Sequence, residues 1–133
     1  MSNDKSKLDT LLEKIIQQQR HARQAGFDWP DALSVIEKVQ EELAELKQAL
    51  IAEDKANIKE EFGDVLLTLV NLSLHLRLDI YETLNASADK FLSRYNMMLK
   101  LIEADELVLD ELSLIKAEGY WQKSKMILKK LKD

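Results

Sequence analysis

Six acidic residues stand in two matched groups, each beside an apolar run. In VQEELAELKQAL (39–50) and NIKEEFGDVLLTLVN (57–71), two adjacent glutamates are followed three residues later by a third acid. The groups are Glu41, Glu42 and Glu45, and then Glu60, Glu61 and Asp64. On a helix, residues three or four positions apart share one flank. Each group therefore presents its carboxylates together on one side of its helix.

Two helices joined by a short turn bring these flanks face to face. At a separation of about 5 Å and an effective dielectric near 20, each like-charge pair costs about 3 kcal/mol. Either the acids extend into water as an ordinary solvated face, or a cation neutralises them, and spacing alone leaves both interpretations open. Oxygen ligands without His or Cys favour a hard ion, Mg²⁺ with Mn²⁺ as a substitute. Because Mg²⁺ usually completes its shell with substrate phosphates, the second interpretation indicates phosphate chemistry.

The composition sets the fold class and narrows the function. The chain has 133 residues with Gly 3 and Pro 1, too few turn residues for hairpins, and this predicts an all-α protein. A net charge of −5 argues against a general affinity for nucleic acid or anionic membranes. The absence of cysteine excludes disulfides, zinc thiolate sites and thiol catalysis. With no apolar signal segment in the first ten residues, we expect a cytoplasmic protein.

Hydrophobic periodicity predicts one domain (1–133), an antiparallel bundle of about five helices at 5–24, 31–52, 56–78, 79–102 and 113–131. We expect 1–25 to be an amphipathic helix, Gly26 to end it, and Pro30 to lie in the first turn of the second. Ser113 is the expected N-cap of the last helix, which Gly119 can interrupt, and 103–112 is an expected loop. The run 65–78 is apolar on nearly every face, so we expect a homodimer to complete the core, with a tetramer left open.

The two acidic groups, EELAE (41–45) and EEFGD (60–64), resemble the paired motifs of the MazG family of nucleotide pyrophosphohydrolases. Flanking segments are similar to the family as well: GFDWPDALSVIEKVQEE, GDVLLTLVNLSLHL, LNASADKFLSRY and YWQKSK. The resemblance covers about residues 26–96 and 113–126. It implies a single MazG-like all-α domain, with motif-bearing helices across 26–102 and a C-terminal helix at 113–131.

The resemblance implies Mg²⁺-dependent hydrolysis of nucleoside triphosphates to the monophosphate and pyrophosphate, as house-cleaning of nucleotide pools. We expect broad base tolerance, because Trp121 and Asn71 are the only candidates to touch the base and stacking tolerates every base. It implies four metal ligands: Glu42, Glu45, Glu61 and Asp64. Glu41 and Glu60 would hold waters or a further ion, or orient the attacking water, and Glu41 is our choice of base. The implied substrate-binding residues are Lys90, Arg94, Trp121, Lys125 and Asn71.

Several of these residues also have an ordinary structural interpretation. Lys90 and Arg94 can be surface charge, and Trp121 can be a packing residue. Lys38 is expected to form an ion pair with Glu42 rather than to contact phosphate. His21 and His75 have no partner at ligand spacing, so we interpret both as structural or surface residues.

Two other classes of function compete with the enzyme. In the first, a non-catalytic helical interaction protein uses the acids as a partner-binding face and binds no Mg²⁺. In the second, a carboxylate-bridged di-iron bundle takes Glu-x-x-His ligands from its helices. No Glu-x-x-His occurs in this chain, which argues strongly against the di-iron class.

Overall fold

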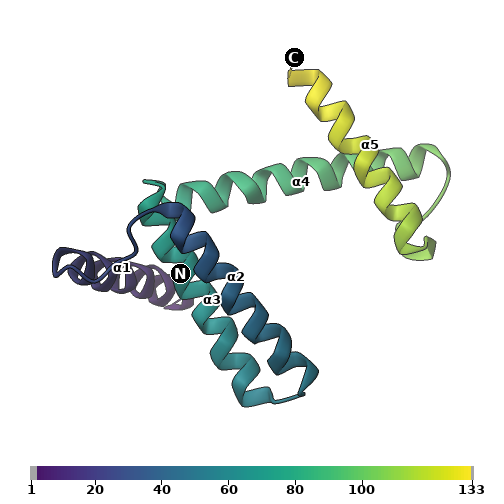
Figure 1. Ribbon diagram of the computed structural model, residues 1–133. Helices are drawn as coiled ribbons and strands as arrows, with labels where there is room; N and C mark the ends of the chain where they lie inside the picture. The colour runs from purple at the N-terminus through teal and green to yellow at the C-terminus, as the bar shows by residue number, and fades with distance from the viewer. Residues whose placement is uncertain (1–2, 133) are drawn as a thin grey trace. The chain divides into compact units, whose positions relative to one another are not determined.

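The computed structural model describes residues 3–132, and the regular secondary structure in this range is helical, with no strand. Its elements are α1 (Asn3–Gln24), α2 (Ala32–Ile51), α3 (Lys55–His75), α4 (Ile80–Ala104), the 3-10 helix η1 (Leu109–Glu111) and α5 (Leu114–Lys132) (Figure 1). The all-α prediction is confirmed. None of these helices has both the length and the apolar character needed to cross a bilayer.

The chain falls into two compact units that divide after Ile80. The first unit holds α1, α2 and α3, and the second holds α4, η1 and α5. The acidic groups belong to the first unit, and the predicted cations Lys90, Arg94 and Lys125 belong to the second. That the whole chain forms one domain stays a prediction.

A very short turn joins α2 to α3 and places the two helices side by side (Figure 1). The turn is closed by Asp54, whose side chain accepts a hydrogen bond from the Asn57 amide at 3.2 Å. Glu53 adopts a positive φ of 54°, the left-handed conformation that reverses the chain. Apolar side chains seal the contact between the helices: Val35, Ala49, Val65 and Val70 are all buried. The acidic flanks beside this contact are thereby brought together.

The start of α2 differs from the sequence-based prediction, which put Pro30 in the first helical turn. Asp31 is the N-cap, with an extended backbone (φ −157°, ψ 172°), and the helix begins at Ala32. The Asp31 carboxylate accepts from the Ser34 amide at 2.8 Å, which satisfies one of the free N–H groups at the helix start. Pro30 therefore precedes the cap. The predicted end of α1 near Gly26 is confirmed, because α1 ends at Gln24 and Gly26 has a φ of +90°.

Helix α3 keeps much apolar surface open to solvent. Phe62, Leu66 and Leu69 are 52, 49 and 41% exposed. Full burial of a large apolar side chain typically contributes about 1.5–3 kcal/mol to stability. Because these three side chains are about half exposed, much of that contribution is absent. The first unit thus has apolar surface left over, and its cover by a second copy stays a prediction.

The second unit is built on the long helix α4, whose last turns bury Met98 and Ile102. Helix α4 runs to Ala104, so the predicted loop 103–112 is shorter than expected and contains η1. Ser113 caps α5 as predicted, since its Oγ accepts from the Lys116 amide at 3.2 Å. Helix α5 passes through Gly119 without a break. The Trp121 and Phe91 rings, with centroids 5.3 Å apart, join α5 to α4.

Candidate metal centre

Three acids from two helices meet at one place in the first unit. Glu42 and Glu45 of α2 and Glu61 of α3 each offer a carboxylate oxygen, and these oxygens lie within 4.8 Å of one another. The spacing of Glu42 and Glu45 puts both on one flank of α2, and the short turn brings Glu61 opposite them. The crowding expected from the sequence is therefore present for these three residues.

Two of the oxygens in this group are buried without any hydrogen-bond partner. Glu42 is only 7% exposed, and its Oε2 atom has no partner among the described residues. The Oε2 atom of Glu61 is in the same state. A buried carboxylate oxygen without a donor is costly, so native proteins normally pair such atoms with a donor or a metal. The arrangement fits a divalent cation held by oxygen ligands, as Mg²⁺ and Mn²⁺ prefer.

The electrostatics of the three-acid group also favour a bound cation. Burial, followed by the neighbouring Glu45 carboxylate and the charges of Asp64 and Glu42, raises the pKa of Glu61 above its usual range. One cation lies nearby: Lys38 Nζ is 3.2 Å from Glu42 Oε1 and 3.5 Å from Glu41 Oε1. The 3.2 Å contact with Glu42 confirms the predicted ion pair, and it raises the pKa of Lys38 above its ordinary value. A single ammonium group leaves the three-acid group with a net negative charge.

The other three acids of the two motifs are more open to solvent. Asp64 is exposed, one turn beyond Glu61, and lies outside the 4.8 Å group. The Glu41 side chain is 60% exposed, and Glu60 is exposed too. In these positions the three carboxylates are open to solvent, to substrate or to a metal ion. The metal-binding role of Asp64 and the catalytic roles of Glu41 and Glu60 remain predictions.

Asn71 lies on the same helix as Glu61, ten residues and about 15 Å further along its axis. It is 4% exposed, and its Nδ2 donates to Gln19 Oε1 of α1 at 2.7 Å. Its own Oδ1 is buried without a partner. Within the described residues, the Asn71 amide nitrogen therefore has a partner, whereas its carbonyl oxygen has none. Gln19 was missed, because nothing in the spacing of α1 marks one glutamine among several.

A second charged group, also missed from the sequence, lies at the end of α3. His75 Nε2 is 3.0 Å from Asp28 Oδ1, and Arg23 Nε donates to Asp28 Oδ2 at 2.6 Å. The side chains of His75 and Asp28 are only 9 and 11% exposed. The three residues tie the segment between α1 and α2 to α3, which agrees with a structural role for His75.

The predicted phosphate and base ligands lie in the second unit. Lys90 and Arg94 of α4 and Lys125 of α5 line one groove of about 870 Å³. Trp121 packs against Phe91, which agrees with the packing interpretation of this residue. Stacking of Trp121 on a base stays a prediction, as do the phosphate contacts of the three cations.

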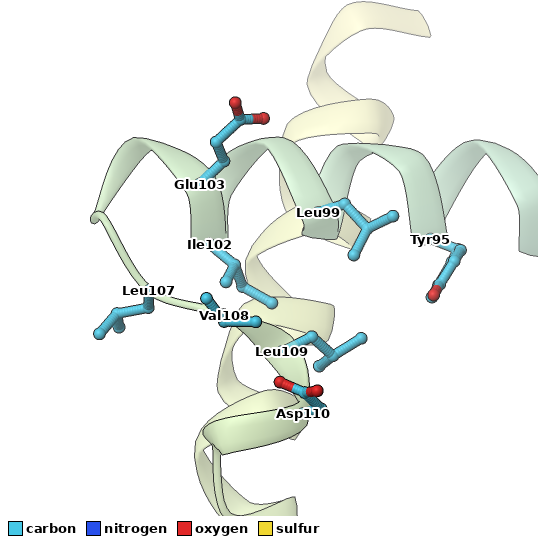
Figure 2. Close-up of a pocket in the computed structure, with 8 residues that line it drawn as sticks. All are labelled: Tyr95, Leu99, Ile102, Glu103, Leu107, Val108, Leu109 and Asp110. Atoms are coloured by element: carbon cyan, nitrogen blue, oxygen red, sulfur yellow. The ribbon is translucent and has the colours of Figure 1, made fainter.

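A smaller pocket of about 440 Å³ in the same unit has a different character (Figure 2). Its lining is mostly apolar, with Leu99, Ile102, Val108 and Leu109 among its residues, and Glu103 points away from them (Figure 2). None of the predicted site residues lines it. We therefore assign no chemistry to this pocket.

Comparison with known proteins agrees with these features. Residues 30–99 match a family model described as the MazG nucleotide pyrophosphohydrolase domain. The chain is 47% identical over 107 residues to the nucleoside triphosphate pyrophosphohydrolase/pyrophosphatase MazG of Thermotoga maritima. It is 32% identical over 111 residues to the nucleoside triphosphate pyrophosphohydrolase of Escherichia coli K12. Each match takes in 80% of this chain and 41% of the relative, so the chain spans less than half the length of either protein.

The matched range includes both acidic motifs and the three acids that meet between α2 and α3. It ends at residue 99, before the whole of α5. By this match, the chain belongs to the MazG nucleotide pyrophosphohydrolase domain family.

Proposed function

We propose that this chain hydrolyses nucleoside triphosphates to the monophosphate and pyrophosphate, with Mg²⁺ as the metal and Mn²⁺ as a substitute. The observation that carries the proposal is the pair of buried, unpartnered oxygens of Glu42 and Glu61 within the three-acid group. The names of the relatives supply the reaction class, and the chain covers 41% of each of the two described here. The activity therefore rests on this site together with the family.

In this proposal Glu42, Glu45, Glu61 and Asp64 would hold the metal. A divalent ion at this place supplies positive charge to phosphate oxygens and lowers the pKa of a bound water. Glu41 or Glu60 accepts the proton of the attacking water, because both are exposed and adjoin the metal ligands in sequence. Glu41 is our first choice, since it is adjacent to the buried Glu42 and its own side chain is 60% exposed.

We propose that five residues contact the substrate. Lys90, Arg94 and Lys125 hold phosphate oxygens by charge-assisted hydrogen bonds. Trp121 stacks on the base, and Asn71 adds a polar contact. Stacking tolerates every base, whereas strong rejection of a wrong base requires a matched set of buried polar groups. We therefore expect kcat/KM to vary by less than about 100-fold among the natural triphosphates.

We also propose a homodimer, with a tetramer as the larger alternative. The half-exposed side chains Phe62, Leu66 and Leu69 of α3 support it, since a second copy can bury them. Sedimentation equilibrium at micromolar concentration is the test. A monomer of 15.4 kDa would contradict this part of the proposal.

The experiment that tests the activity is pyrophosphate release from the eight common NTPs and dNTPs, with and without Mg²⁺. Glu42→Gln is expected to lose activity on all eight. The matched control is Glu37→Gln, an exposed acid on the same helix outside the motif, which is expected to keep it. Activity confined to one base would show that polar groups other than Trp121 and Asn71 recognise the base.

The competing function, a non-catalytic interaction protein with an acidic face, makes the opposite prediction. Such a protein releases no pyrophosphate from any nucleotide and gains no stability from Mg²⁺. The buried, unpartnered oxygens of Glu42 and Glu61 disfavour this alternative. Acids that bind a partner from a solvated face stay hydrated, whereas burial of an unpaired carboxylate oxygen costs free energy.

A further inference from the structure

The groove between α4 and α5 is lined by more cations than the family resemblance accounts for. Five of them contribute to it: Lys90, Arg94, Lys125, Lys129 and Lys132. Asp89 is the one acid among the described residues of the lining. Lys129 and Lys132 lie beyond the last motif that resembles the family and outside the matched range 30–99. Their presence in the groove was not predicted from the sequence.

Helical spacing explains how the five cations come to face one space. Lys90 and Arg94 are four residues apart, so they share one side of α4. Lys125, Lys129 and Lys132 are spaced by four and three, so they form a stripe along one side of α5. That stripe extends for about 10 Å along the helix axis. The groove between the two rows measures about 870 Å³.

Within residues 3–132, no ion pair balances the positive charges of this groove. Among the residues that the structure describes, none of the five cations has an ion-pair partner. By contrast, Arg23 and Lys38 of the first unit both have carboxylate partners. The chain carries 24 acids and 19 basic residues, so acids to pair with are not scarce. Like charges one turn apart destabilise a helix unless an anion binds between them.

The apolar part of the lining strengthens the field of these cations. Met126, Leu128 and Leu131 of α5 contribute to the same groove. Walls of low dielectric focus the field of a charged cleft and raise the local concentration of an oppositely charged ligand. Arg94 adds a planar fork of donors that matches two oxygens of one phosphate group, while the lysines act as point charges.

We propose that this groove is a binding site for a short polyphosphate chain, in which Lys129 and Lys132 are additional phosphate-binding residues. The inference rests on the proposed function in one respect, since Lys90, Arg94 and Lys125 are phosphate ligands in both. A compact, multiply charged anion matches five cations gathered around a short groove. A long nucleic acid matches less well, because the chain as a whole is negative, at −5.

The test is calorimetric titration of the full chain with inorganic tripolyphosphate in metal-free buffer. The variant Lys129→Gln/Lys132→Gln is expected to bind roughly tenfold more weakly than the parent protein, through the loss of two charge-assisted contacts. The matched control Lys116→Gln/Lys130→Gln removes two charges from the same helix outside the groove, and is expected to stay within about twofold. Equal losses in both variants would overturn the proposal, because they would reveal a general charge effect.

Further measurements distinguish the polyphosphate site from the proposed hydrolytic function and from nucleic-acid binding. Glu61→Gln is expected to keep its affinity for tripolyphosphate, because no metal is present. Tripolyphosphate binding without nucleotide hydrolysis would sink the proposed function alone. Hydrolysis without Lys129- and Lys132-dependent binding would sink the polyphosphate site alone. A ten-nucleotide oligothymidylate that binds through Lys129 and Lys132 more tightly than tripolyphosphate would assign the groove to nucleic acid and overturn the proposal.

Discussion

Two carboxylate sites next to α3 differ in how their surroundings change the carboxyl pKa: one site lowers it and the other raises it. Near the last turn, Asp28 lies beside His75 and Arg23 and also accepts from the Trp29 amide at 2.8 Å. Burial opposes ionisation there, but the hydrogen bonds from Arg23, His75 and Trp29 outweigh it and hold the pKa of Asp28 at about 2. Near the start of α3, burial and other carboxylates raise the pKa of Glu61 instead.

The difference teaches how to separate a structural charge from a functional one. The Asp28 group is compensated by the protein itself, so it stabilises the fold without any ligand. The group of Glu42, Glu45 and Glu61 has one ammonium partner, Lys38, and two unpartnered buried oxygens. It is therefore destabilising until a cation from outside arrives. A carboxyl pKa raised by burial and by neighbouring like charges is typical of functional sites.

The largest expected effect comes from Glu61→Gln, which removes a charge and keeps the shape. We expect kcat/KM for pyrophosphate release to fall by more than about 100-fold, because the loss of even an indirect metal contact costs up to that much. In metal-free buffer the melting temperature should stay equal or rise, since one crowded charge is gone. Near-normal turnover, or a sharply lower metal-free melting temperature, would show that Glu61 is an ordinary structural acid.

Asp28→Asn is expected to act in the opposite direction on stability. The ordinary pKa of 3.8 is lowered to about 2, which corresponds to a contribution of about 2 kcal/mol to the free energy of unfolding. Because the folded pKa is the lower one, this contribution is complete above pH 3.8 and is lost as the pH falls toward 2. The gap between parent and variant in denaturant unfolding should therefore close over that range.

The control for Asp28→Asn is Asp9→Asn, at an exposed acid of α1 outside the group of Asp28, His75 and Arg23. It is expected to change the free energy of unfolding by less than about 0.5 kcal/mol. A gap between Asp28→Asn and the parent that does not depend on pH would mean that packing, rather than ionisation, makes Asp28 important.

A smaller effect is expected at Gln19, which joins α1 to α3. Gln19→Ala leaves Asn71 with neither its amide nitrogen nor its Oδ1 paired, at a cost of about 1 kcal/mol or more. Thermal unfolding of Gln19→Ala, Asn71→Ala and the double variant gives the coupling between the two side chains. Strictly additive losses would show that the 2.7 Å contact contributes nothing.

Local sequence signals predicted the elements of this fold well. Apolar spacing, the Ser113 cap and Gly26 placed the helices to within a few residues, because each signal acts over one or two turns. Pro30 was misplaced because Asp31 competes for the cap and has the better side chain for it. Gly119 does not break α5, since one glycine costs a helix only about 1 kcal/mol, less than tertiary contacts can supply.

The candidate site was predictable only where chemistry repeats at short spacing. Glu42, Glu45 and Glu61 could be placed together from two motifs and one turn. The contacts of Gln19 with Asn71 and of Asp28 with His75 join residues 52 and 47 positions apart, and no local pattern marks them. Lys129 and Lys132 were passed over for another reason: a lysine-rich helix end normally denotes a solvated surface.

The most direct test of the central claim is thermal unfolding of the parent and of Glu61→Gln, each titrated with Mg²⁺. A ligand that binds only the folded state stabilises it, by about 2.7 kcal/mol at a concentration 100 times its dissociation constant. We predict that the parent starts no more stable than Glu61→Gln without metal and gains stability steadily with Mg²⁺, while the variant gains little. An identical response of the two proteins to Mg²⁺ would contradict the assignment of these acids as a metal centre.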